Sequence, residues 1–140
     1  MFKPKKFEIM KITKIWANLA VANLERTNNF YQQLGFKSNN PNQSKELTSF
    51  MVGKDDFIIH FFLKEILEAN LNIQMCNPKQ ESEVIFSIAA ESKEEVEDWQ
   101  KLVEKARGTI FSAPASIGNG YTFGFSDPDG HKFNILYWPK

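Results

Sequence analysis

Apolar side chains recur at two spacings along this chain, and the spacings alternate in the same order twice. Alternate residues are apolar over 12–21, which predicts a strand, and the spacing over 24–34 is helical. The first half continues with predicted strands at 36–38, 47–52 and 57–63. A polar connector, 65–82, begins with a short helical turn. The second half then repeats the order, with a strand at 83–90, a helix from Ser92 to about Ala106, a strand at 109–112, a loop at 113–120, and a hairpin of strands at 121–126 and 132–138.

The ends of both helices carry capping signals. Asn23 is placed as the N-cap of the first helix, and Gly35 follows its last turn, where a left-handed residue is common. Ser92 with Glu95 three residues later predicts a capping box at the start of the second helix.

Two units of the order βαβββ therefore make up the chain, and they predict an α+β fold. We expect a tail at 1–11 and a single domain at 12–138. Its modules are 12–64 and 83–138, joined by the connector 65–82. A length of 140 residues is typical of one domain or of two small fused repeats.

Two segments carry a resemblance to a known family. One is the stretch 15–36, a strand followed by the Asn23-capped helix; the other is the hairpin turn Asp127-Pro128-Asp129-Gly130. Together they resemble the vicinal oxygen chelate superfamily of glyoxalases, bleomycin resistance proteins and extradiol dioxygenases. The resemblance implies two modules whose sheets curve around a cleft, and it implies a homodimer.

The strands have one apolar face and one mixed face, because side chains alternate along a strand. Ile15, Ala17, Leu19 and Val21 share the face predicted to pack under the first helix. Apolar walls with a few polar groups are typical of a small-molecule pocket. We therefore predict that the mixed faces bind a small-molecule ligand. Phe123 or Phe125 is a further aromatic candidate for the wall of this pocket. The predicted ligand-binding residues are Trp16, Asn18, His60, Phe62, Phe123, Asn134 and Trp138.

The resemblance also assigns four metal-ligand positions, which in metal-using relatives hold His, Gln or Glu. Here they are Trp16, His60, Ile85 and Asn134. Only His60 is a good ligand, and Asn134 offers an amide oxygen, which suits a transition metal poorly. A catalytic site normally has three protein ligands. We therefore expect no cofactor, and a divalent metal is disfavoured.

His60 has two interpretations. A lone His between Ile58-Ile59 and Phe61-Phe62 is either a hydrogen-bonded pocket residue or a catalytic general base. The apolar flanks favour the neutral imidazole in both cases. We expect His131 to contact backbone or solvent at the turn, away from any ligand set.

Charge and cysteine content limit the classes of partner that we expect for this protein. Lys and Arg number 17, as do Asp and Glu, and no basic stripe indicates nucleic acid. Cys76 is the one cysteine, which we expect to be a free thiol. The first residues lack the apolar run of a signal peptide, and no segment reaches membrane-spanning length, so we expect a cytoplasmic protein without a membrane partner.

These observations favour a metal-free protein that binds a small molecule in an aromatic-lined cleft and forms a homodimer. The alternative is a lyase or dioxygenase-like enzyme, either with a degenerate metal site or with His60 as general base. A domain without a ligand is the third interpretation, which a filled cleft would favour.

Overall fold

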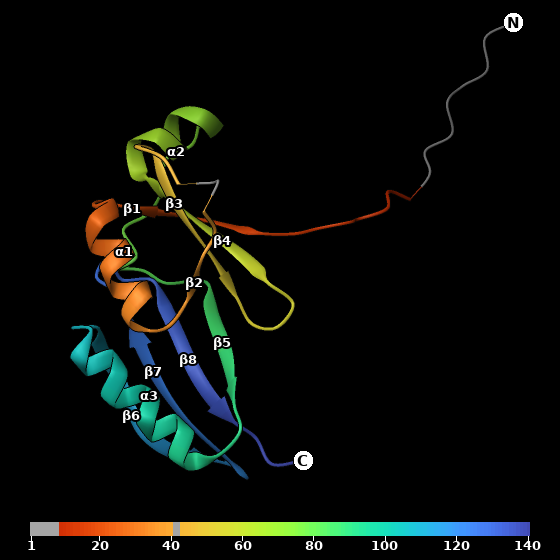
Figure 1. Cartoon of the computed structure of the whole chain (residues 1–140), viewed down its shortest axis with the longest axis vertical. Coiled ribbons are helices and arrows are strands. Elements are labelled where there is room, and N and C mark those ends of the chain that lie inside the picture. Colours follow the sequence, from red (N-terminus) through yellow and green to blue (C-terminus); the bar gives the residue numbers. More distant parts are fainter. Residues whose placement is uncertain (1–8, 41–42) are drawn as a thin grey trace, which may run out of the picture.

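Two four-stranded sheets, each crossed by one helix, form the protein in the computed structural model, which describes residues 9–40 and 43–140 (Figure 1). Sheet A has the strand order β1-β4-β3-β2, and sheet B has the order β5-β8-β7-β6. In each sheet the first strand of the module pairs in parallel with the last, and the other pairs are antiparallel. The predicted α+β fold of two βαβββ modules is confirmed.

The elements of the first module follow the sequence pattern closely. They are β1 (Ala17–Val21), α1 (Leu24–Gln33), β2 (Lys37–Ser38), β3 (Leu47–Val52), β4 (Phe57–Leu63) and α2 (Lys64–Leu71). The Asn23 side chain accepts a hydrogen bond from the Arg26 backbone N–H, which confirms the cap, and Gly35 has φ +86°. The connector holds a full helix, α2, where only a turn was expected.

The second module repeats the order. Its elements are β5 (Ile85–Ala90), α3 (Lys93–Lys105), β6 (Thr109–Ile117), β7 (Gly120–Ser126) and β8 (Lys132–Tyr137). Ser92 Oγ accepts from the Glu95 N–H, as predicted, but the Glu95 carboxylate accepts from the N–H of Glu91 rather than from that of Ser92. The capping box is therefore shifted by one residue.

The predicted loop at 113–120 is wrong, because β6 continues to Ile117. The register of β6 against β7 shifts between Ile110 and Ser112 and again between Ser112 and Ala115. Pro114 lies in this irregular stretch of an edge strand, where a residue without an N–H is tolerated. The predicted strand at 12–21 was also too long, since β1 begins at Ala17.

The core lies between the helices and one face of each sheet. Tyr31 of α1 stacks on Phe61 of β4 and contacts Phe133 of β8, so this helix bridges both sheets. Val96 and Val103 of α3 are buried in the same cluster. Figure 1 shows α1 and α3 along the same side of the molecule. Neither α1 nor α3 covers the opposite face of each sheet, and we call it the open face. Within the described residues, no helix is long and apolar enough to cross a membrane.

Candidate functional site on the open faces

The open face of sheet A centres on His60. Asn18 of β1 and Ser49 of β3 flank it across the sheet, and its ring meets Trp16 and Phe62 edge-on, at centroid distances of 6.1 and 6.0 Å. Four of the predicted site residues, Trp16, Asn18, His60 and Phe62, are thus together on one surface. The residues between them, such as Ile59 and Phe61, are buried on the opposite face.

His60 has an unusual environment for an imidazole. Its Nδ1 is buried and has no hydrogen-bond partner among the described residues. Burial lowers the pKa of His60 below its ordinary value, and the nearby charge of Lys14 lowers it further. The ring is therefore neutral near pH 7 and is flanked by aromatic rings, and no carboxylate in the described part of the chain hydrogen-bonds to it.

The open face of sheet B carries a short polar row. Asn134 of β8 lies between Ser87 of β5 and Gly124 of β7. Ser87 Oγ donates to Asn134 Oδ1, and Asn134 Nδ2 donates to Thr122 Oγ1 at 3.2 Å. The hydroxyl of Thr122 donates in turn to the backbone carbonyl of Ile135 at 2.7 Å. The amide of Asn134 is thereby fixed by two hydroxyl groups.

Two aromatic rings on this face rest on glycines. A Cβ at Gly120 would lie 2.4 Å from Trp138 Cε3, and one at Gly118 would lie 3.2 Å from Trp138 Cη2. A Cβ at Gly124 would lie 2.5 Å from Cε1 and Cζ of Phe111. The glycines therefore make room for two rings, with Phe111 over the cross-strand neighbour of Asn134 and Trp138 farther along the same face.

Phe111, Ser87 and Thr122 were missed from the sequence. Phe111 reaches the open face because the irregular register of β6 breaks the alternation used to assign faces. Gly118, Gly120 and Gly124 were a usable signal, since glycine in a strand often marks close approach of another group.

Two sequence assignments are corrected by burial. Phe123 is fully buried, stacked on Phe125 and paired with Ile135 on the face that α3 covers, so neither Phe123 nor Phe125 lines the open face. Ile15 was expected under the first helix but precedes β1 and is exposed. Asn134 and Trp138 lie on the open face as predicted.

The four expected metal positions do not fit a metal ion. Trp16 stands two residues before Asn18, the cross-strand neighbour of His60, and Ile85 stands two residues before Ser87, the neighbour of Asn134. The two sheets thus offer an indole and an alkyl chain where ligands would be needed. No group of three or more His, Cys, Asp or Glu able to hold a metal occurs among residues 9–40 and 43–140.

Hollows on this side of the single chain are open or small. One of about 550 Å³ lies beside Trp138 and is also lined by Ser87 and Leu136. Another of about 280 Å³ lies between β1, β5 and the connector, with Asn18, Phe86 and Cys76 in its wall. Drug-sized ligands need roughly 300–1,000 Å³.

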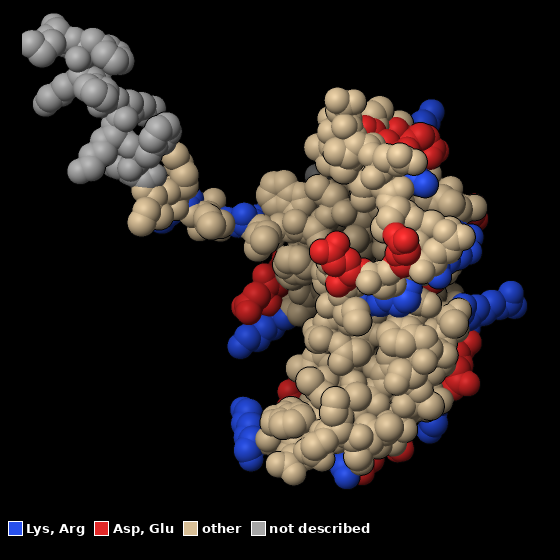
Figure 2. Space-filling view, turned by 180° about the vertical axis from the view of Figure 1, so that it is seen from behind, with Lys and Arg blue, Asp and Glu red and all other residues tan. Residues whose placement is uncertain are grey.

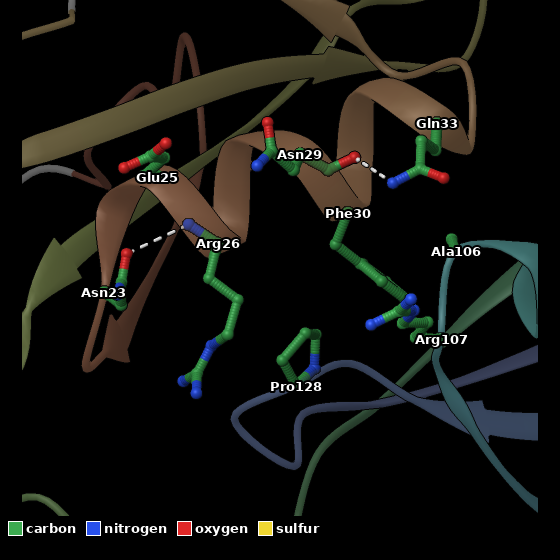
Figure 3. Close-up of a pocket in the computed structure, with 9 residues that line it drawn as sticks. All are labelled: Asn23, Glu25, Arg26, Asn29, Phe30, Gln33, Ala106, Arg107 and Pro128. Atoms are coloured by element: carbon green, nitrogen blue, oxygen red, sulfur yellow. Dashed lines mark hydrogen bonds between the residues drawn. The ribbon is translucent and has the colours of Figure 1, made fainter.

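A further hollow of about 520 Å³ lies on the helix side, between α1 and the end of α3. Figure 3 shows Arg26 and Phe30 projecting from α1 on either side of Pro128, with the Phe30 ring reaching toward Arg107. Arg26 is already held by Asp129 in a 2.8 Å ion pair, and Phe30 belongs to the core. These contacts anchor the hairpin turn, and we assign this hollow a structural role.

The sequence decides the family. The strand order, the helix between the first and second strands, and the duplicated layout agree with it. The sequence model of the Glyoxalase/Bleomycin resistance protein/Dioxygenase superfamily matches residues 14–135. This chain belongs to that superfamily.

Solved structures of the superfamily and its relatives share this fold. A hypothetical protein from S. aureus is 26% identical, with a TM-score of 0.81 over 92% of this chain and 96% of that one. Lactoylglutathione lyase from Agrobacterium tumefaciens is 18% identical, with a TM-score of 0.65 over 91% and 96%. Fosfomycin resistance protein FosX from Mesorhizobium loti is 14% identical, with a TM-score of 0.68 over 93% and 95%. No curated protein shows significant sequence similarity to the chain.

Proposed function

We propose that this superfamily member is a metal-free cytoplasmic protein that binds a planar small molecule on its open faces. The observation that carries the proposal is the seating of Trp138 on Gly118 and Gly120, on the same face of sheet B as the fixed amide of Asn134. An exposed indole held in place offers a flat surface for stacking, and a fixed amide offers directional hydrogen bonds.

The proposal excludes a metal because of the side chains that occupy the four expected ligand positions. Trp16 and Ile85 cannot ligate an ion, and the Oδ1 of Asn134 already accepts from Ser87. His60 would be the single strong ligand, whereas a catalytic metal normally has three protein ligands.

We further propose that the protein acts as a homodimer in which the open faces of two chains enclose the ligand. The hollows on the open side of one chain are shallow or small, and large apolar side chains there are uncovered. Trp16 and Trp138 are each about half exposed. A second copy would enclose a ligand between such surfaces.

The test uses two probes of the same shape, 1-naphthol and N-methylquinolinium, followed by tryptophan fluorescence. We expect saturable quenching with the wild-type protein and at least tenfold weaker binding with Trp138→Ala. Trp99→Phe, on α3 and away from the open faces, is the matched control and should bind like wild type. Preference for the charged probe would indicate a cation–π contribution. The proposal fails if neither probe binds the wild-type protein.

Metal content is measured on the same preparation. We expect no stoichiometric Ni, Zn, Mn or Fe by elemental analysis, and no rise in melting temperature when these ions are added. Tight stoichiometric metal would contradict the metal-free proposal, because it would require ligands beyond His60.

An enzymatic function with His60 as general base is the second candidate. The buried, unpartnered Nδ1 and the lowered pKa of His60 favour it, because they keep the imidazole unprotonated near pH 7, which is the form that a general base needs. Since one structural relative is named a lactoylglutathione lyase, the assay is formation of lactoylglutathione from methylglyoxal and glutathione. Activity that is present in wild type and lost in His60→Gln would favour this candidate, and inactivity of both would leave the binding function.

A further inference from the structure

A buried hydroxyl lies beside His60 on the open face of sheet A. Ser49 of β3 is the direct cross-strand neighbour of His60, and paired positions of a sheet point to the same side. Ser49 is completely buried, whereas Asn18, the polar neighbour on the other side of His60, is exposed. Ser49 is therefore the buried polar neighbour available to the buried Nδ1 of His60.

The contacts of Ser49 use its hydroxyl only as an acceptor. Asn39 Nδ2 donates to Ser49 Oγ at 3.0 Å, and the backbone N–H of Asn39 donates to the Ser49 carbonyl at 2.9 Å. A serine hydroxyl also has one hydrogen to donate. No hydrogen bond within the described part of the chain has this hydroxyl as its donor. A buried donor without an acceptor costs stability, so this hydrogen needs a partner.

His60 has the complementary deficit, because its buried Nδ1 has no partner among the described residues. The Cβ atoms of a directly opposed antiparallel pair lie about 4.5–5.5 Å apart. Rotation of the two side chains is therefore enough to bring the hydroxyl of Ser49 to the ring nitrogen. His60 is partly exposed, which leaves its ring room to turn.

We propose that Ser49 donates its hydrogen to Nδ1 of His60 and so holds the neutral imidazole as the Nε2–H tautomer, with this N–H directed at an oxygen atom of the ligand. A ring nitrogen that accepts a hydrogen bond cannot also carry the proton. This inference rests on the proposed function and adds to it the chemical class of the ligand, which is a planar ring bearing a carbonyl or phenolate oxygen. Ser49 is then a positioning residue that acts through His60.

The outer side of the His60 ring is accessible to such a ligand. Nδ1 is buried while the residue is partly exposed, which places the exposed part of the ring toward Nε2. Figures 1 and 2 show the extended chain before β1 leading away from the body, so this segment does not cover the ring. The charge of Lys14 acts on the same ring, and a positive charge favours a ligand atom that is negative or partly negative.

The same arrangement disfavours His60 as a general base. A base must offer the substrate a nitrogen with a free lone pair. In the proposed tautomer Nε2 carries the hydrogen, and the lone pair of Nδ1 is taken by Ser49. The inference therefore separates the binding function from the enzymatic candidate by the position of one proton.

The tautomer is measured by NMR of the full chain labelled with 15N-histidine, at pH 7.5, where the ring is neutral. His60→Gln assigns the signals, because the chain has two histidines. In wild type we expect Nδ1 to be the unprotonated nitrogen, with a 15N resonance shifted upfield by the hydrogen bond that it accepts. In Ser49→Ala this resonance should move downfield, because the donor has been removed.

Thr48→Val is the matched control. It also removes a buried hydroxyl from β3, but Thr48 points to the opposite face and bonds Asn28. The His60 resonances should therefore stay as in wild type. A proton on Nδ1 in wild type, or an Nδ1 resonance that is the same in wild type and Ser49→Ala, would overturn the proposal. If Ser49→Ala does not fold, Ser49→Cys replaces it, since a thiol is a weaker donor and should give a smaller downfield shift.

The ligand class is tested with 1-acetonaphthone and 1-ethylnaphthalene, which have similar shapes and differ in the carbonyl oxygen. Tryptophan quenching gives both dissociation constants, and their ratio is the readout. We expect wild type to bind the ketone about fivefold more tightly, as one additional hydrogen bond would give. His60→Phe keeps a flat ring without an N–H and should lose this preference. Equal binding of the two probes by wild type would overturn the assigned ligand class.

Failure of this inference and failure of the proposed function are distinguishable. If no aromatic probe binds wild type, the binding function and the ligand class fail together, whereas the tautomer is read without any ligand. If the probes bind but Nδ1 carries the proton, the role of Ser49 fails and the binding function is retained.

Discussion

The hydroxyl of Tyr31 donates a 2.6 Å hydrogen bond to Oδ2 of Asp127, joining the helix of the first module to the hairpin turn of the second. Both side chains are buried, and the other carboxylate oxygen accepts from the backbone N–H groups of Asp129 and His131. Asp129 in turn accepts from Ala22 N–H and from Arg26. The Asp-Pro-Asp-Gly turn is therefore the polar link between the modules.

Replacing Tyr31 with Phe should lower the free energy of unfolding by about 1–3 kcal/mol, because a buried carboxylate oxygen loses its partner while the ring keeps its stacking on Phe61. Urea denaturation measures the change. Tyr121→Phe is the control, since that hydroxyl bonds Glu97 at the surface and its loss should cost less than about 0.5 kcal/mol. Equal effects of the two substitutions would contradict the assigned role of Asp127.

The lowered pKa of His60 predicts a pH dependence of stability. In the unfolded chain this imidazole takes up a proton near its ordinary pKa of 6.5, whereas in the folded chain it does so only at lower pH. The unfolded state binds more protons in that window, so the contribution of His60 to stability is present above pH 6.5 and is lost as the pH falls toward the folded pKa.

The comparison of wild type with His60→Gln isolates this contribution. We expect the stability of wild type to fall more steeply than that of the variant between pH 7.5 and pH 5.5. The NMR resonances of the His60 imidazole should titrate with a midpoint below pH 6.5. A midpoint above 6.5 would mean that a negative partner faces the ring.

The glycines beneath the open-face rings give a graded prediction. Gly120→Ala places a Cβ 2.8 Å from the Tyr137 carbonyl oxygen as well as against Trp138, and backbone cannot easily move. We expect a loss of about 1–3 kcal/mol, typical of overpacking. Gly124→Ala meets only the ring of Phe111, which is partly exposed and can swing away, so its cost should be smaller. Thermal denaturation would show the order, and a reversed order would contradict it.

The cap of α1 is testable in the same assay. Asn23→Ala removes the acceptor of the Arg26 N–H and should lower stability by about 1 kcal/mol. Asn29→Ala is the matched control, because it lies within the same helix and alanine favours helix there. Asn23→Ala should be the less stable of the two, and the opposite ranking would show that the cap contributes little.

The sequence predicted most of the fold because its signals are local. The caps at Asn23 and Ser92, the alternation in β4 and the turn at Gly130 each depend on residues a few positions apart. The errors fall where local rules fail. The alternating pattern was read as a strand through 12–16, although β1 begins only at Ala17. The Gly and Pro residues of 113–120 were read as a loop, although most of this stretch belongs to the irregular edge strand β6.

The candidate site was predicted in part for the same reason. Parity along a regular strand places His60, Phe62 and Asn134 correctly on the open faces. Parity was not applied to Phe123, which was added for its ring and not for its face. Parity could not place Phe111 either, because its position depends on the register shifts of β6, which are set by pairing with β7.

The hairpin turn has a consequence for how the chain acquires its structure. His131 meets the carbonyl of Ala20 across 111 residues of sequence, and Asp129 meets Ala22 across 107. Closing such long loops is slow, because chain entropy is lost before the contacts form. On a ribosome the first module would emerge with these partners still to be synthesised. We therefore expect that it cannot complete its folding until the final hairpin has been released.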